Sequence, residues 1–170
     1  MKHFRWGILG TGAIARAFAD GLQTTEKSRL VAVGSRSAAS AEAFAEGYPG
    51  TRAQGSYEEL FADPEVHAVY ISAPHPFHAL WSIRAMEAGK HVLCEKPMAL
   101  NRWQAEAMVA CAARHRRFLA EGFMYRLHPQ TTRLVDLLRE GAIGEVRMIR
   151  AAFGFGGGDA LDTESRLFRN

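Results

Sequence analysis

Two ionisable side chains, Glu95 and Lys96, follow the apolar run HVLC and precede Pro97. Because proline disfavours helical backbone at the residue before it, Lys96 should leave the end of a strand in an extended direction. A lysine in a hydride-transfer site can hydrogen-bond the reacting oxygen, stabilise developing negative charge and pass on a proton. We therefore take Lys96 as a candidate catalytic and cofactor-binding residue, with Glu95 orienting a ribose or holding Lys96. A surface salt bridge is the structural alternative.

A second candidate site is the segment ILGTGAIARAF, in which Gly10, Gly12 and Ala15 form the pattern G-x-G-x-x-A between an apolar run and a helical one. The first glycine permits a tight turn, the second lets a pyrophosphate approach the backbone, and the alanine allows close packing of helix on strand. The helix N-terminus offers unpaired N–H groups to the anion. A purely structural turn is the alternative. The predicted dinucleotide contacts come from Gly10, Thr11, Gly12, Ala13 and Ile14.

The type of dinucleotide should depend on the end of the next strand, where Ser35 and Arg36 stand in place of a carboxylate. An acidic residue there would bind the ribose 2′-hydroxyl of NAD, whereas a guanidinium pairs with the 2′-phosphate of NADP. The sequence therefore favours NADP, with NAD still possible, and Ser35 and Arg36 are predicted cofactor-binding residues. Arg36 as an ordinary surface arginine at a helix start is the alternative.

The segment SAPHPFH follows another apolar run, at the strand end where open α/β sheets bind ligands. Its predicted cofactor contacts are Ser72, Pro74, His75 and His78. For each histidine, helix capping or packing is the alternative to contact with the ribose or nicotinamide. The two histidines lack further ligands at useful spacing, so we predict no metal site.

The elements that position these residues alternate along the chain. Strands are predicted at 4–9, 29–35, 67–73, 91–95 and 117–125, and helices at 14–22, 38–46, 76–90 and 101–114. A short helix should begin at Ser56, whose spacing to Glu59 is that of a capping box, and Asn101 with Gln104 marks a similar start. This alternation predicts an α/β fold, a Rossmann-type doubly wound parallel sheet with helices on both faces.

The pattern changes after residue 125. A helix is predicted at 130–140, followed by a strand over 145–157 in which basic and apolar residues alternate, and then by a glycine-rich polar tail. We assign residues 1–125 to the dinucleotide-binding domain and residues 126–170 to the start of a truncated C-terminal α/β domain for substrate binding or oligomerisation. Arg126 and His128 are candidate substrate contacts, with structural roles as the alternative.

Composition is that of a soluble globular protein: 170 residues, 48% hydrophobic, 23% charged, with a formal net charge of +3. Basic residues are scattered apart from the cluster at 114–117, which we interpret as a solvated helix end, so no nucleic-acid partner is expected. Cys94 and Cys111 lie in apolar stretches without metal-binding spacing, which favours reduced cysteines and the cytoplasm. No signal peptide and no membrane span are predicted.

Three segments together carry a family resemblance: GILGTGAIA, YISAPHPFHALWSIRAMEAGKHVLCEKPMALN and REGAIGEVRMIRA. The chain resembles the Gfo/Idh/MocA family of NAD(P)-dependent oxidoreductases, most closely the branch of dihydrodiol dehydrogenases and NADP-dependent xylose dehydrogenases. The resemblance implies that Lys96 is the catalytic-site lysine and that residues 72–78 lie against the cofactor. It also implies a C-terminal α/β domain, a homo-oligomer at full length, and a second proton-transfer residue beyond Asn170.

Three functional hypotheses follow. The first is an NADP(H)-dependent oxidoreductase, or its N-terminal portion, that moves hydride between nicotinamide and a secondary alcohol or carbonyl of a sugar, polyol or dihydrodiol. The second is a redox glycosidase of the same family that retains a tightly held NAD. The third is a catalytically inactive dinucleotide-binding module that acts as a sensor or partner subunit.

Overall fold

The computed structural model describes residues 3–152 and 154. It divides into two compact units with the boundary between Met124 and Tyr125. Among the described residues, no helix combines the length and the apolar character that crossing a membrane requires.

The first unit contains one six-stranded sheet in the order β3-β2-β1-β4-β5-β6, and every pair of neighbours is parallel. This order confirms the predicted doubly wound Rossmann fold, because the chain starts in the middle of the sheet and builds outward in both directions. The strands are β1 Phe4–Leu9, β2 Ser28–Gly34, β3 Arg52–Gln54, β4 Ala68–Ile71, β5 His91–Cys94 and β6 Leu119–Glu121.

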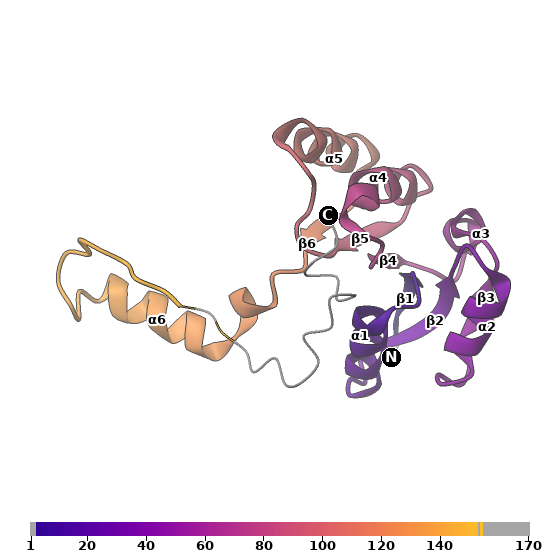
Figure 1. The fold of residues 1–170 in the computed structure, drawn as a ribbon, viewed down its shortest axis with the longest axis horizontal. Coiled ribbons are helices and arrows are strands. Elements are labelled where there is room, and N and C mark those ends of the chain that lie inside the picture. The colour runs from indigo at the N-terminus through magenta and orange to yellow at the C-terminus, as the bar shows by residue number, and fades with distance from the viewer. Residues whose placement is uncertain (1–2, 153, 155–170) are drawn as a thin grey trace. The chain divides into compact units, whose positions relative to one another are not determined.

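Helices connect successive strands, as the parallel topology requires (Figure 1). Helices α4 and α5 pack on one another. The helices of this unit are α1 Ala13–Gln23, α2 Ala38–Ala45, α3 Tyr57–Ala62, α4 His78–Glu87 and α5 Arg102–His115, with the short 3-10 helices η1 His75–Phe77 and η2 Met124–Leu127, the second of which crosses the unit boundary.

Both faces of the sheet are buried, because successive side chains of a strand point to opposite faces. Ile8 packs with Ala15 and Phe44 from α1 and α2. The next residue, Leu9, packs in the other cluster with residues such as Met86 and Met108 from α4 and α5. This double burial explains why the central strands read as continuous apolar runs rather than as alternating ones.

Two predicted helix starts are confirmed by their hydrogen bonds. The Ser56 hydroxyl accepts from the Glu59 amide at 3.1 Å, and the Asn101 Oδ1 accepts from the Gln104 amide at 3.0 Å. Each of these bonds satisfies an N–H group that has no partner within the helix. Helix α3, which leads into β4, and helix α5, which leads into β6, therefore both begin with a capped first turn.

Element boundaries differ from the prediction in three places. The edge strand β3 is absent from the predicted strands, because an edge strand carries charged residues and this one lacks an apolar pattern. Strand β6 covers three residues rather than the predicted 117–125. The predicted helix at 76–90 begins with the separate 3-10 turn η1, since Pro74 and Pro76 supply no N–H groups to a regular first turn.

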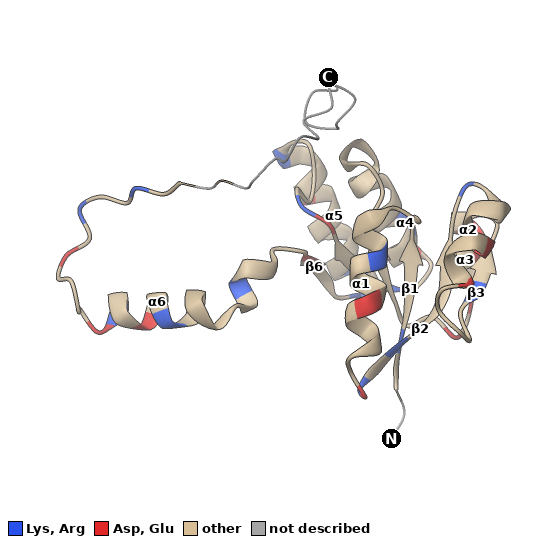
Figure 2. Cartoon of the chain, turned by 60° about the horizontal axis from the view of Figure 1, so that its bottom comes forward, with Lys and Arg blue, Asp and Glu red and all other residues tan. Residues whose placement is uncertain are grey.

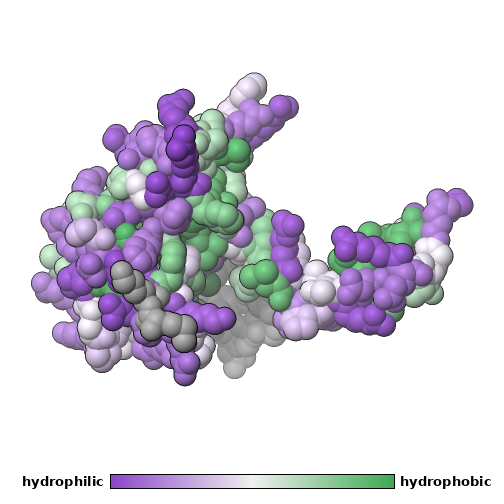
Figure 3. Space-filling model, turned by 180° about the vertical axis from the view of Figure 1, so that it is seen from behind, coloured by the Kyte–Doolittle hydropathy of each residue, from purple (hydrophilic) through white to green (hydrophobic). Residues whose placement is uncertain are grey.

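The second unit contains α6, Pro129–Arg139, which confirms the predicted helix within one residue. The predicted strand at 145–157 is wrong for residues 145–152, which form no strand. A strand exists only when it pairs with a neighbour, and residues 145–152 pair with none in the described chain. Residues 153 and 155–157 of that prediction lie outside the described residues. Figure 3 shows apolar and hydrophilic side chains mixed over the surface around α6.

Charged residues are distributed over many elements, with basic and acidic positions interspersed (Figure 2). The basic cluster at 114–117 forms the C-terminal end of α5, as predicted. Arg116 adopts the left-handed conformation of the C-cap, and Arg117 donates to the backbone oxygens of His115 and Gly89. Cations at a helix C-terminus also interact favourably with the helix dipole, so this cluster has a structural explanation.

Candidate functional site

Four strands end in register at one edge of the sheet. Gly34, Leu9, Ile71 and Cys94 are consecutive partners across β2, β1, β4 and β5. The residue that follows each of three strands then bonds the neighbouring strand: Gly10 N–H donates to Gly34 O at 2.9 Å, Ser72 N–H to Leu9 O at 3.1 Å, and Glu95 N–H to Ile71 O at 3.0 Å. The loops that begin at residues 10, 35, 72 and 95 therefore leave the sheet along the same edge, where open α/β sheets bind ligands.

The glycine loop connects β1 to α1. Gly10 has a φ of +105°, and a Cβ there would lie 2.8 Å from the Ser72 Oγ, so the turn needs glycine for both its conformation and its space. Gly12 is the N-cap of α1 and receives no side-chain cap. A Cβ at Gly12 would meet nothing within 4 Å. The space above this helix start is open, and Ala15 is fully buried against the sheet.

The first turn of α1 presents its N–H groups to this open space. Thr11 is partly buried, whereas Gly12, Ala13 and Ile14 are exposed. The first N–H groups of a helix have no intrahelical partner, and they carry the positive end of the helix dipole. A loop with a missing Cβ and uncapped N–H groups fits a pyrophosphate, which is the predicted ligand of residues 10–14.

Ser35 and Arg36 follow β2 at the same edge. Ser35 is buried, and its Oγ accepts a hydrogen bond from the Ser37 amide at 3.3 Å. Ser37 is the N-cap of α2, with its hydroxyl accepting from the Ser40 amide. Arg36 is exposed. The two serines thus shape the turn, and the Arg36 guanidinium interacts with the hydroxyl of Tyr57, the first residue of α3.

Residues 72–78 cross from β4 to α4. The Ser72 hydroxyl donates to Leu9 O at 2.7 Å and holds this loop against the glycine turn. Pro74 and His75 are exposed, whereas His78 is 2% exposed. Both ring nitrogens of His78 lie 2.7 Å from backbone oxygens, Nδ1 from Pro97 O and Nε2 from Ala73 O. These bonds agree with the packing alternative for His78, and its predicted cofactor contact stays a prediction.

The Glu95-Lys96-Pro97 corner follows β5. Lys96 is exposed and Glu95 is partly buried. The Glu95 Oε2 accepts from the Lys96 amide at 3.1 Å, so Glu95 holds the backbone of Lys96 rather than its ammonium group. The Lys96–Pro97 peptide bond is cis. Lys96 is exposed in the loop that follows β5, at the same edge of the sheet as the glycine loop.

Tyr70 and Glu121 also contribute to this corner, although no motif in the sequence predicted a role for either residue. The Tyr70 hydroxyl donates to Glu95 Oε1 at 2.5 Å, and burial together with this bond raises the pKa of Tyr70 well above its usual value. The Glu121 Oε1 accepts from the Met98 amide at 2.7 Å. Because the strand AVYI is fully buried, the Tyr70 hydroxyl needs a hydrogen-bond partner inside the protein. A tyrosine within an apolar run was therefore the sequence signal that pointed to such a partner.

Cys94 precedes this corner but lacks the properties of a nucleophile. It is fully buried, and burial raises the pKa of its thiol to about 11. A nucleophilic cysteine needs a lowered pKa and access to solvent. Among the described residues, no cluster of three or more His, Cys, Asp or Glu side chains has a geometry that could hold a metal ion.

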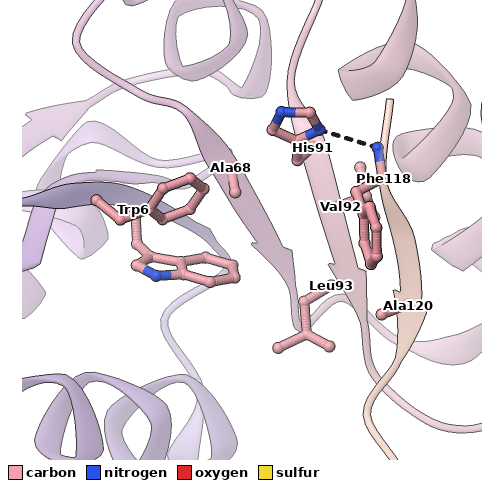
Figure 4. A pocket seen from close by; sticks show the side chains of 8 residues that line it. Trp6, Ala68, His91, Val92, Leu93, Phe118 and Ala120 are labelled. Carbon is pink, nitrogen blue, oxygen red and sulfur yellow. Dashed lines mark hydrogen bonds between the residues drawn. The ribbon is translucent and has the colours of Figure 1, made fainter. Parts of the chain in front are cut away.

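An apolar cavity of about 340 Å³ opens elsewhere on the sheet (Figure 4). Its lining includes Trp6, Leu93 and Phe118, and the Nδ1 of its histidine, His91, accepts from the Phe118 amide. None of the predicted cofactor residues lines this cavity. Its other lining residues are apolar apart from the indole N–H of Trp6, so the cavity lacks the converging polar groups of a cofactor site.

Residues 4–123 match the family described as "Oxidoreductase family, NAD-binding Rossmann fold", GFO_IDH_MocA. The match covers the whole sheet, the glycine loop and the Lys96 corner. The chain belongs to the Gfo/Idh/MocA family. The predicted family resemblance is thereby confirmed.

Among family relatives, the chain is 44% identical over 154 residues to the uncharacterized oxidoreductase ORF334 of Rhizobium meliloti, covering 90% of this chain and 46% of the relative. It is 41% identical over 152 residues to trans-1,2-dihydrobenzene-1,2-diol dehydrogenase of Danio rerio, with 88% and 46% coverage. The chain thus spans about half the length of the curated relatives it matches.

Solved structures similar to this chain have the same fold. KijD10, a 3-ketoreductase from Actinomadura kijaniata in complex with NADP, superposes with a TM-score of 0.79 at 38% identity, covering 86% of this chain and 47% of that one. An NAD binding oxidoreductase from Klebsiella pneumoniae superposes with a TM-score of 0.78 at 30% identity, with 85% and 40% coverage. The Rossmann unit is therefore shared with both structures.

Proposed function

We propose that this family member binds NADP(H) and forms the cofactor-binding part of an oxidoreductase that moves hydride between nicotinamide and a secondary alcohol or carbonyl of a sugar, polyol or dihydrodiol. The observation that supports this most is the register of strand ends, which presents the glycine loop, Arg36 and Lys96 along one edge. The related diol dehydrogenase and 3-ketoreductase are named for the two directions of one reaction type, the interconversion of an alcohol and a carbonyl.

Each part of this edge has a role in the proposal. The N–H groups at residues 11–14 bind the pyrophosphate, and Arg36 pairs with the 2′-phosphate. Bound NADP(H) supplies the hydride chemistry. The Lys96 ammonium donates a hydrogen bond to the reacting oxygen and moves a proton to or from it. Glu95, fixed by Tyr70, keeps the Lys96 backbone in place.

The substrate and the assembly belong to the same proposal. A small-molecule substrate approaches Lys96 from the exposed side, and further contacts come from a C-terminal domain that also carries the homo-oligomer interface. The His128 side chain accepts from the Gln130 amide and caps α6, so a structural role explains this candidate without a substrate. The buried free cysteines are the reason for the predicted cytoplasmic location, which stays a prediction.

The experiment is a titration of the chain with NADPH and NADH, followed by nicotinamide fluorescence, for the wild type and Arg36→Ala. We expect Arg36→Ala to weaken NADPH binding about tenfold or more and to leave NADH binding unchanged, because a charge-assisted hydrogen bond is lost only with the phosphorylated cofactor. Arg29→Ala is the matched control, since Arg29 is an exposed arginine near the opposite end of the same strand. Equal wild-type affinity for both nucleotides would contradict the NADP assignment.

A further inference from the structure

The first turn of α3 lies directly against the end of β2. A Cβ on Gly34, the last residue of β2, would lie 3.0 Å from the Cβ of Leu60 and 3.3 Å from the backbone oxygen of Ser56. At the next position along the chain, the Ser35 amide donates to the backbone oxygen of Gln54 at 3.2 Å. The loop that follows β2 and the start of α3 are therefore side by side at the edge of the sheet that carries the candidate site.

Tyr57 is the first residue of α3, and the fold fixes the place of its side chain. The preceding residue, Ser56, caps the helix by accepting from the Glu59 amide at 3.1 Å. Tyr57 is 8% exposed, and its ring packs edge-on against Trp81 with the ring centroids 4.8 Å apart. A capped first turn and a packed ring leave the side chain little freedom, so the position of its hydroxyl is set before any ligand binds.

The Tyr57 hydroxyl meets the guanidinium of Arg36. A guanidinium has only hydrogen-bond donors, so the phenol oxygen accepts from Arg36 and the hydroxyl proton points elsewhere. Burial raises the pKa of the Tyr57 phenol, and Arg36 offsets only part of that rise, so the hydroxyl keeps its proton at neutral pH. The hydroxyl can therefore accept from Arg36 and donate to another group at the same time.

Arg36 has donors to spare for an anion. Among the described residues, no carboxylate forms an ion pair with it. A guanidinium has five N–H donors, and a bond to one phenol oxygen uses few of them. A phosphate that accepts from this cation lies within reach of the neighbouring phenol O–H. A cation beside a neutral donor fits the charged 2′-phosphate of NADP(H), whereas the 2′-hydroxyl of NAD(H) is uncharged.

We propose that Tyr57 is a specificity-determining residue for NADP(H): its hydroxyl fixes the Arg36 guanidinium at the edge of the sheet and donates its own proton to the 2′-phosphate. This inference rests on the proposed function, because it adds a residue to the proposed NADP(H) site. The sequence predicted only a helix cap at Ser56 and Glu59 in this segment, so Tyr57 is an addition from the tertiary structure.

The test removes only the hydroxyl. Tyr57→Phe retains the ring that packs on Trp81, and fluorescence titration of the full chain with NADPH and with NADH measures the effect. We expect NADPH affinity to fall about tenfold, since a hydrogen bond to a charged group is lost, and NADH affinity to stay unchanged. The ratio of the two affinities is the readout, because a loss of stability would affect the binding of both nucleotides alike.

A double-mutant cycle with Arg36→Ala tests whether the two residues act together. If the hydroxyl fixes the guanidinium, Tyr57→Phe should reduce NADPH affinity less in the Arg36→Ala background than in the wild type. An equal reduction in both backgrounds would overturn the positioning of Arg36 by Tyr57.

Tyr48→Phe is the matched control. Tyr48 is also a buried tyrosine with a hydrogen-bonded hydroxyl, which donates to Asp20 Oδ1 at 2.9 Å. It packs beside Leu30, near the start of β2 and so at the opposite end of the strand. This variant should retain the wild-type ratio of NADPH to NADH affinity. Wild-type protein that binds neither nucleotide would refute the proposed function itself. A wild-type ratio in Tyr57→Phe would refute the role of Tyr57 alone.

Discussion

Gly10 and Gly12 are two residues apart in the same loop, yet they need glycine for different reasons. At Gly10 the constraint is internal, because φ is +105° and the space for a Cβ is filled by the Ser72 hydroxyl. At Gly12 the backbone is compatible with other residues, with a φ of −75°, and the space is open. Only a ligand gives a reason for glycine at the second position.

This difference predicts opposite effects of the same substitution. Gly12→Ala should keep the free energy of unfolding within about 1 kcal/mol of the wild type and weaken NADPH binding about tenfold or more, because the new methyl group stands where the pyrophosphate approaches. Gly10→Ala should lower the free energy of unfolding by at least about 1 kcal/mol, since alanine resists a positive φ. Urea unfolding and fluorescence titration measure both. Unchanged NADPH binding by Gly12→Ala would place the pyrophosphate elsewhere.

At the scale of elements, an ion pair between Arg52 and Asp63 connects the edge strand β3 to the end of α3, the helix that leads into β4. Arg52 donates to Asp63 Oδ2 through two nitrogens, at 3.0 and 2.7 Å. Burial alone would raise the pKa of Asp63, but the bonds from Arg52 and the Glu65 amide outweigh it and lower the pKa. The folded state therefore stabilises the carboxylate form.

The direction of that shift gives a pH dependence. Because the folded-state pKa of Asp63 lies below its ordinary value of 3.8, the bond contributes its full stability above that pH and loses it as the pH falls further. Asp63→Asn should cost about 1.5 kcal/mol at pH 7, the low end for a charged hydrogen bond because Arg52 is half exposed. It should also flatten the loss of stability in acid. Urea unfolding between pH 7 and pH 3 measures both effects.

The control for this pair is Glu46→Gln, which removes an exposed carboxylate at the C-cap of α2. It should leave the free energy of unfolding at pH 7 close to the wild-type value, as surface substitutions usually do. If Asp63→Asn retains the wild-type slope in acid, another carboxylate is responsible for the acid sensitivity.

At the scale of the whole molecule, the predicted cofactor-binding residues and the second unit occupy separate parts of the sequence. All predicted cofactor-binding residues lie between Gly10 and Lys96, and the buried residues of both core clusters lie before Met124. The first unit thus contains a complete sheet with a core on each face. The second unit presents exposed apolar side chains, among them Leu127 and Leu134.

We therefore expect a chain ending at Met124 to fold and to bind NADPH with wild-type affinity, because its core and its candidate site are both retained. Circular dichroism and thermal unfolding test the fold, and fluorescence titration tests the binding. A folded truncation that no longer binds NADPH would assign part of the cofactor site to the second unit. An unfolded truncation would show that the first unit depends on contacts with residues after Met124.

The sequence by itself determined the features that depend on neighbouring residues. The glycine loop, the caps at Ser56 and Asn101, and the alternation of strands and helices are set by local backbone preferences and hydrophobic period. These local rules predicted Gly12, Arg36 and Lys96 in the segments that follow strands. They also led to the parallel Rossmann sheet, since alternating strands and helices can form few other topologies.

Only the tertiary structure decided which distant groups meet. Tyr70 bonds Glu95 across 25 positions of sequence, and His78 bonds Pro97 across 19, and no periodicity encodes either pairing. The edge strand β3 and the absent strand at 145–152 depend equally on whether a neighbouring strand is in reach. The type of a side chain determines which hydrogen bonds it can form. Strand register and the paths of the loops determine which partner it meets, because they set the distances between groups.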